Sequence, residues 1–134
     1  MIGTFIHLNL PTKNVAAARE FYSKVGFDIN TDYSSDQNVF VVVAQNVQLI
    51  LADEGFLKQL GETRAFADTS TTTEGSVAIS VDSREKVDEV FEAAIAAGGT
   101  QAGDTVEEVE FGLYARAFYD LDGHRIDINH MSAQ

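Results

Sequence analysis

The chain has 134 residues, of which 9 are lysine or arginine and 21 are aspartate or glutamate, so its formal net charge at pH 7 is −12. This charge repels phosphate backbones and anionic lipids, so neither nucleic acid nor an acidic membrane surface is expected as a partner. The length suits one domain, and a hydrophobic fraction of 45% is typical of a folded protein. Cysteine is absent, which excludes disulfides, thiolate metal sites and thiol nucleophiles.

We expect no secretory or membrane-targeting segment in this sequence. Its apolar runs are far shorter than the ~18 residues that a membrane-spanning helix needs. Residues 1–5 lack the basic and apolar regions of a secretory signal. We therefore expect no membrane partner and a cytoplasmic location.

The first half of the chain predicts one helix among several strands. Residues 5–10 form an apolar run of strand length that ends at Pro11. Asn14 is placed to cap a helix, whose apolar residues recur at helical spacing until Gly26 ends it. Further strands are expected at residues 27–29, 39–44 and 47–51, the last two as a hairpin.

The second half repeats this order after a connector. A strand is expected at residues 76–81, then a helix capped by Ser83 and ended by Gly98 and Gly99, then a polar loop. Strands at residues 113–119 and 124–129 follow, joined by a turn in which we interpret His124 as a turn residue. The repeated order indicates an internal duplication. We expect one domain over residues 1–134, with module one at about 1–53, a connector at about 54–74 and module two at about 75–131.

Each predicted strand has one apolar face and one polar face, because side chains alternate along a strand. The apolar face should pack on the helices. The other face would simply be hydrated in many antiparallel sheets. Here it is poor in lysine and glutamate, which favours the lining of a concave site. Its polar residues are His7, Asn9, Gln48, Ser76, Ser80, Arg125, Asp127 and Asn129.

Residues 5–11 (FIHLNLP), 18–27 (AREFYSKVGF) and 117–127 (AFYDLDGHRID) resemble the opening and closing segments of the vicinal oxygen chelate superfamily. This superfamily includes glyoxalase I, bleomycin- and fosfomycin-resistance proteins and extradiol dioxygenases. The most similar subgroup is that of the predicted lactoylglutathione lyases. The resemblance implies an α+β fold, in which two βαβββ modules form a curved mixed sheet around a cleft with helices on the outer face. It also implies a homodimer.

The resemblance further implies a divalent metal (Zn, Ni, Fe or Mn) that binds two vicinal oxygens of a substrate. His7 matches the metal-binding histidine of the first strand. Asp127 falls at the closing carboxylate position, where the family usually has glutamate. The other two ligand positions of the glyoxalase pattern fall on Ser76 and Ile50, which are poor metal ligands.

Two functions stay open at this point. One is metal-assisted chemistry of the lyase, isomerase or dioxygenase type, with a third ligand from Gln48, from Glu74 or from the connector. The other is metal-free binding of a small molecule, as in the bleomycin-resistance branch, with His7 and Asp127 as a polar pair. In both cases we expect the substrate or ligand to contact polar side chains of the strands. These residues are Asn9, Gln48, Ser76, Arg116, Arg125 and Asn129.

Overall fold

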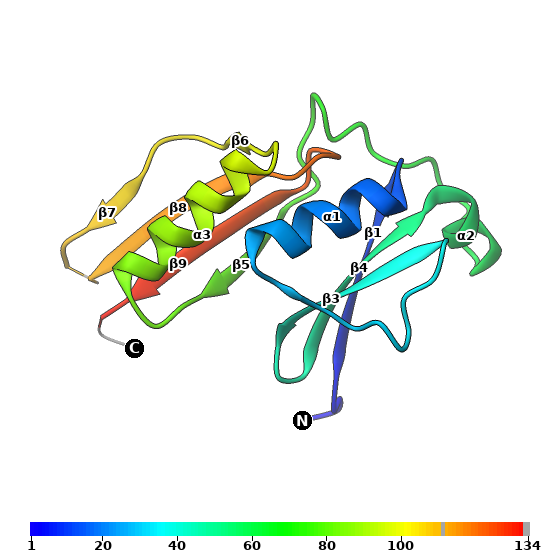
Figure 1. Cartoon of the computed structure of the whole chain (residues 1–134), viewed down its shortest axis with the longest axis horizontal. Helices are drawn as coiled ribbons and strands as arrows, with labels where there is room; N and C mark the ends of the chain where they lie inside the picture. The colour runs from blue at the N-terminus through cyan, green and yellow to red at the C-terminus, as the bar shows by residue number, and fades with distance from the viewer. Residues whose placement is uncertain (111, 133–134) are drawn as a thin grey trace. The chain divides into compact units, whose positions relative to one another are not determined.

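The computed structural model describes residues 1–110 and 112–132. The chain divides into two compact units between Phe66 and Ala67, a boundary that lies inside the expected connector. Each unit contains one mixed sheet and a long helix, which confirms the α+β class (Figure 1). The expectation that both units act as one domain stays a prediction.

The first unit is a four-stranded sheet in the order β1-β4-β3-β2, with β1 parallel to β4 and the other pairs antiparallel. Its elements, in chain order, are β1 (Ile6–Thr12), α1 (Val15–Val25), β2 (Asp28–Ile29), β3 (Asn38–Ala44), β4 (Val47–Asp53) and α2 (Glu54–Gln59). Helix α1 lies along one face of this sheet (Figure 1).

Both predicted ends of α1 are confirmed. The Asn14 side chain accepts a hydrogen bond from the Ala17 N–H at 3.0 Å, which satisfies one of the free amides of the first turn. Gly26 ends the helix with a φ of 116°, a left-handed conformation that glycine adopts without strain. Between these ends, the apolar residues along one side of α1 are buried. The alternate residues of β3 and β4 that face α1 are buried as well. The buried residues are Ala18, Phe21, Tyr22, Val25, Val39, Val41, Leu49 and Leu51.

The second unit repeats the topology, with the strand order β5-β9-β8-β6, β5 parallel to β9, and β7 paired to β8. Its elements are β5 (Ser76–Ser80), α3 (Arg84–Ala96), β6 (Thr100–Gln101), β7 (Val106–Glu108), β8 (Leu113–Tyr119) and β9 (Arg125–Met131). The duplication predicted from the sequence is therefore confirmed. Its core joins one face of α3 to β8 and β9 through Val87, Phe91, Ala94, Phe118, Ile126 and Ile128.

Strands β6 and β7 are the elements that the sequence pattern missed, because it predicted a polar loop there. Both are short, and their residues are exposed, so they show no alternation of apolar and polar residues. They are strands only because they pair with β8. Pairing with a neighbour, and not local sequence, produces them.

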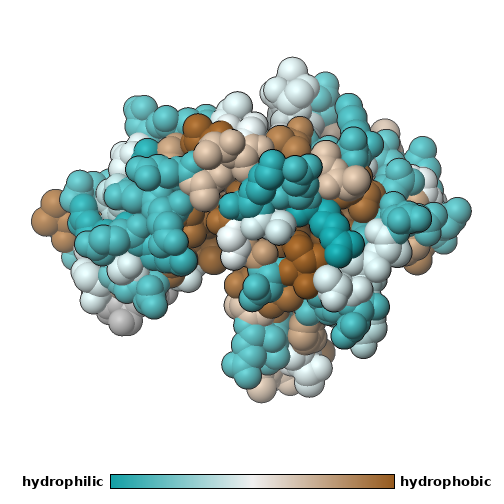
Figure 2. Space-filling view, in the orientation of Figure 1, coloured by the Kyte–Doolittle hydropathy of each residue, from teal (hydrophilic) through white to brown (hydrophobic). Residues whose placement is uncertain are grey.

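The surface is largely polar, in keeping with the net charge of −12. Figure 2 shows hydrophilic residues over much of the face in view, with hydrophobic residues in smaller patches between them. No helix within residues 1–110 and 112–132 is long and apolar enough to cross a membrane.

Candidate functional site: the open sheet faces

One face of the first sheet is left open by α1, and it carries the predicted polar residues of that unit. His7 and Gln48 are direct partners across β1 and β4, and Asn9 is the partner of Ile50. In a parallel pair, partner residues point to the same side of the sheet. The imidazole of His7 and the amide of Gln48 therefore lie side by side, while Ile50 offers no polar atom.

The ring of His7 is exposed and packs against other rings. Its centroid lies 4.7 Å from that of Phe5, with 26° between the planes, and 6.2 Å from that of Phe40 in an edge-on arrangement. Next to it, the Gln48 Oε1 accepts a long hydrogen bond from the Asn30 Nδ2 at 3.5 Å. This open face therefore combines an imidazole, aromatic rings and amides.

The open face of the second sheet carries its own polar row. Ser76 is the partner of Arg125, Ala78 of Asp127, and Ser80 of Asn129 across β5 and β9. The Ser80 hydroxyl donates to the Asn129 Oδ1 at 2.8 Å. Serine, asparagine and an ion pair are thus brought together, as the alternation of the strands predicts.

Arg125 and Asp127 form the ion pair of this row. The Arg125 Nε donates to both carboxylate oxygens of Asp127, at 3.3 and 3.2 Å, and its Nη2 donates to Oδ1 at 3.1 Å. These contacts raise the pKa of Arg125 above its ordinary value, mainly through the hydrogen bond to Asp127. The carboxylate that the resemblance assigns to a metal is held by an arginine two residues away.

Arg116 lies elsewhere. It is the partner of Ile128 across β8 and β9, so it points to the face that α3 covers. There its Nη1 donates to the Asp88 Oδ1 at 3.0 Å, and its guanidinium lies 3.8 Å from the centroid of the Phe91 ring. The structure therefore separates Arg116 from the open face that carries Arg125.

Asp88, which sequence analysis did not single out, is the centre of this second cluster. It also accepts a hydrogen bond from the Tyr114 hydroxyl at 2.6 Å. The hydrogen bonds from Tyr114 and then Arg116 hold the pKa of Asp88 below its ordinary value, while Asp88 raises the pKa of Tyr114. The local sequence of α3 does not indicate this role for Asp88. The role follows from its position on the helix face opposite Tyr114 and Arg116 of β8.

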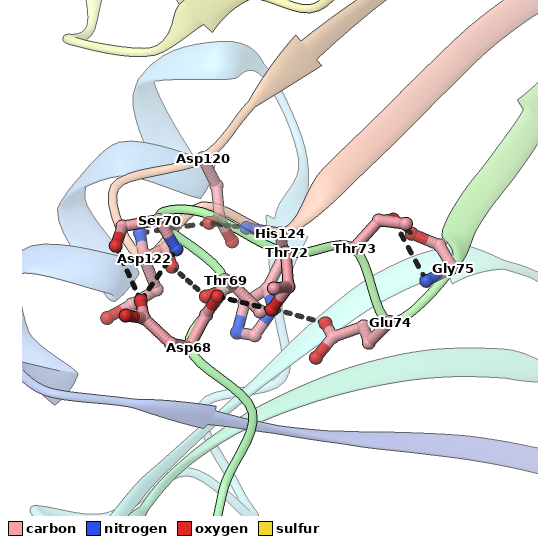
Figure 3. Close-up of polar contacts among 10 residues, drawn as sticks. All are labelled: Asp68, Thr69, Ser70, Thr72, Thr73, Glu74, Gly75, Asp120, Asp122 and His124. Carbon is pink, nitrogen blue, oxygen red and sulfur yellow. Dashed lines mark hydrogen bonds and ion pairs between the residues drawn. The ribbon is translucent and has the colours of Figure 1, made fainter.

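The turn between β8 and β9 is tied to the connector. The buried ring of His124, which is 2% exposed, places its Nδ1 2.5 Å from the Glu74 Oε1, and the two side chains point toward each other in Figure 3. The Thr69 hydroxyl donates to the carbonyl oxygen of Asp122 at 2.5 Å. His124 does belong to a turn, as expected. The contact with Glu74, fifty residues away, is what the sequence did not predict.

This turn also contains three residues of types that bind metals. Asp120, Asp122 and His124 place one ligand atom each within 4.8 Å of one another, the only such group within the described residues. However, the Asp120 Oδ1 accepts the backbone N–H groups of Asp122 and His124, at 3.0 and 2.9 Å. His124 is also bound to Glu74. These hydrogen bonds build the turn, and we assign the group that structural role.

The residues at the family's metal positions fit a divalent metal poorly. Catalytic zinc generally has three protein ligands, from imidazole, thiolate or carboxylate. His7 offers an imidazole, but Ile50 has no ligand atom and Ser76 only a neutral hydroxyl. Binding a metal through Asp127 would compete with its contacts with Arg125.

Comparison with known proteins places this fold in a family. The sequence model of the glyoxalase/bleomycin resistance protein/dioxygenase superfamily matches residues 4–128. The structure of the hypothetical protein SA1046 from S. aureus is 22% identical, with 97% of this chain and 94% of that chain covered and a TM-score of 0.77. A glyoxalase/bleomycin resistance protein/dioxygenase family enzyme from Burkholderia phytofirmans PsJN is 22% identical, with 92% and 95% covered and a TM-score of 0.71.

The structure of lactoylglutathione lyase from Agrobacterium tumefaciens is 19% identical, with 96% of this chain and 93% of that chain covered and a TM-score of 0.64. No curated protein matches the sequence. At these identities the solved structures establish the fold alone. The family match, which spans nearly the whole sequence, establishes membership. The chain therefore belongs to the glyoxalase/bleomycin resistance protein/dioxygenase superfamily.

Proposed function

We propose that this protein binds a small molecule without a metal, in the manner of the bleomycin-resistance branch of its superfamily. The observation that carries the proposal is the ion pair between Arg125 and Asp127. It neutralises the one carboxylate at a family ligand position. With Ile50 and Ser76 at two other positions, His7 is left as the only strong ligand. The open sheet faces would then bind the ligand through their hydrogen-bonding side chains and aromatic rings.

The experiment measures metal content and metal dependence together. Protein made without a histidine tag is analysed by elemental mass spectrometry, before and after incubation with Zn, Ni, Mn and Fe(II). A small-molecule library is then screened by thermal shift in EDTA. A ligand present at 100 times its dissociation constant stabilises the fold by about 2.7 kcal/mol. For a chain of this size that free energy raises the melting temperature by roughly 9 °C.

Three variants make the metal measurement specific. His7→Ala and Asp127→Asn remove the two family ligands. His130→Gln is the matched control, because His130 bonds through Nδ1 to the Val81 carbonyl on the other face of its sheet. The proposal expects no stoichiometric metal in any form of the protein. One equivalent of metal that is lost in His7→Ala and Asp127→Asn, but kept in the control, would contradict it.

That contradicting outcome would support the second candidate, metal-assisted chemistry of the lyase, isomerase or dioxygenase type. The exposed imidazole of His7 beside the Gln48 amide favours this candidate. In it, the metal would supply a Lewis acid for two vicinal oxygens. His7 and Asp127 would be its ligands, in competition with the contacts of Asp127 to Arg125.

We further propose that the protein is a cytoplasmic homodimer. Support for the dimer comes from β1, an edge strand of the first sheet whose Ile6 is 56% exposed. Light scattering across a dilution series tests the assembly, and a monomer at every concentration would exclude the dimer.

A further inference from the structure

Four ring side chains gather on the open face of the first unit, and we call them the aromatic platform: Phe5, His7, Phe40 and Tyr33. Phe5 and His7 are stacked, and Phe40 meets the His7 ring edge-on. Tyr33 extends the group, because its ring centroid lies 6.0 Å from that of Phe40. Phe5 directly precedes β1, His7 lies on β1, and Phe40 lies on β3. Tyr33 lies in the loop between β2 and β3.

The loop that carries Tyr33 is fixed to the backbone of Phe40. The Asn30 N–H donates to the Phe40 carbonyl at 2.8 Å, and the Phe40 N–H donates to the Ser34 hydroxyl oxygen at 3.0 Å. The same hydroxyl donates to the Asn30 carbonyl at 2.7 Å. These bonds flank Tyr33 on both sides along the chain. They hold the loop backbone that carries Tyr33 beside Phe40, so a ligand need not order this segment, which lowers the entropy cost of binding.

Three of the four platform rings, those of Phe5, His7 and Tyr33, are exposed, unlike the large rings of the cores. Phe5 is 40% exposed and Tyr33 is 71% exposed, whereas Phe21, Tyr22 and Phe118 are almost fully buried. An exposed group of rings costs solvation free energy, and such groups commonly mark a binding surface. The flat faces of the rings suit another flat ring, through offset stacking or edge contacts.

Amides stand next to the rings. The Gln48 Oε1 already accepts from Asn30, so its NH₂ group is left to donate to a ligand. Asn9 is exposed on the same face, two residues along β1 from His7. Donors beside a ring surface suit a ligand with oxygen atoms at its edge. The net charge of −12 disfavours an anionic ligand.

We propose that the aromatic platform binds a planar aromatic molecule, uncharged or cationic, with phenol or ketone oxygens at its edge. This proposal rests on the proposed function and names the ligand class for it. The rings supply stacking and the Gln48 amide donates to the edge oxygen.

The test compares two ketone probes that carry the same edge oxygen and differ in whether their fused rings are aromatic and flat: 2-acetylnaphthalene and its ring-saturated analogue, 2-acetyldecalin. Each is titrated into the full chain in EDTA, and the backbone amides are followed by NMR. Ring contacts add to the burial of apolar area, so the aromatic probe should bind about two- to tenfold more tightly. The largest shifts should fall on the platform residues.

Two variants, Phe5→Leu and Tyr33→Leu, keep apolar area and remove a ring. Each should reduce the preference for the aromatic probe. The control is Phe66→Leu, because Phe66 is a half-buried ring outside the platform that faces Lys58. NMR spectra of the free variants verify that each is folded, and the two substitutions test the platform independently.

Several results would overturn the ligand class. They are equal affinity for both probes, binding of neither, or an unchanged preference in both variants. Failure of the proposed function is seen in a different measurement, as one equivalent of metal that is bound by the wild type and lost in His7→Ala and Asp127→Asn. The ratio of the two affinities, measured with the metal, would still test the platform.

Discussion

Replacing Asp88 by alanine should destabilise the second unit measurably, although the residue lies on a half-exposed helix face. The change removes the hydrogen bond from Tyr114 at 2.6 Å and the ion pair with Arg116 at 3.0 Å. A buried hydrogen bond to a charged group contributes about 1.5–3 kcal/mol. The Asp88 side chain is 43% exposed, so solvent screening reduces each value. We expect a total loss of about 2 kcal/mol.

The substitution also affects Arg116, the ion-pair partner of Asp88. The Arg116 Nε is buried and has no hydrogen-bond partner within the described residues. Without Asp88, the guanidinium would keep its stacking on Phe91 but lose the carboxylate that balances its charge. An unpaired, partly buried charge is costly. Rotation of Arg116 into solvent is the relaxation that sets the lower limit of the effect.

Urea unfolding followed by circular dichroism measures this loss. With a slope of about 2 kcal/mol per molar urea, a loss of about 2 kcal/mol lowers the midpoint by roughly 1 M. Glu92→Ala is the matched control, an acidic residue one turn along the same helix. If the Asp88→Ala midpoint agrees with that of the control, the cluster does not stabilise the fold and the reasoning is wrong.

The pH dependence has a definite sign. The folded-state pKa of Asp88 is lowered from 3.8, so its contribution is present above that value and is lost as the pH falls through the lowered pKa. The folded-state pKa of Tyr114 is raised from 10.0, so its contribution is present below that value and is lost as the pH rises through the raised pKa. The stability difference between wild type and Asp88→Ala should therefore be constant between these limits and shrink outside them. A difference that changed across neutral pH would contradict this assignment.

Three further substitutions probe the turn, the connector and the first helix. Gly123→Ala should cost more than about 1–2 kcal/mol in thermal unfolding, because φ is +86° and the new Cβ would overlap the Thr69 carbonyl oxygen; an unchanged melting temperature would refute this. Glu74→Gln removes the charged partner of buried His124, and we expect faster hydrogen exchange across residues 68–75, whereas equal rates would show that the pair does not hold the connector. Asn14→Ala should cost about 1 kcal/mol through loss of the α1 cap, with Asn14→Asp near wild type as the control.

Local sequence determined the elements and their faces. The alternation along β1 and β9, and the caps at Asn14 and Ser83, depend on residues within a few positions of one another. Such short-range patterns follow directly from the period of a strand or a helix. The pair of Arg125 and Asp127 also lies on one strand, two residues apart, and the spacing alone places both side chains on one face.

Only the tertiary structure decided which side chains meet across the chain. Arg116 faces Asp88, 28 residues away, because the register of β8 on β9 turns it toward α3. His124 meets Glu74 across 50 residues because the connector folds over the turn. The edge strands β6 and β7 exist only through pairing with β8. Register and long-range packing minimise the free energy of the whole unit, and no local period encodes them.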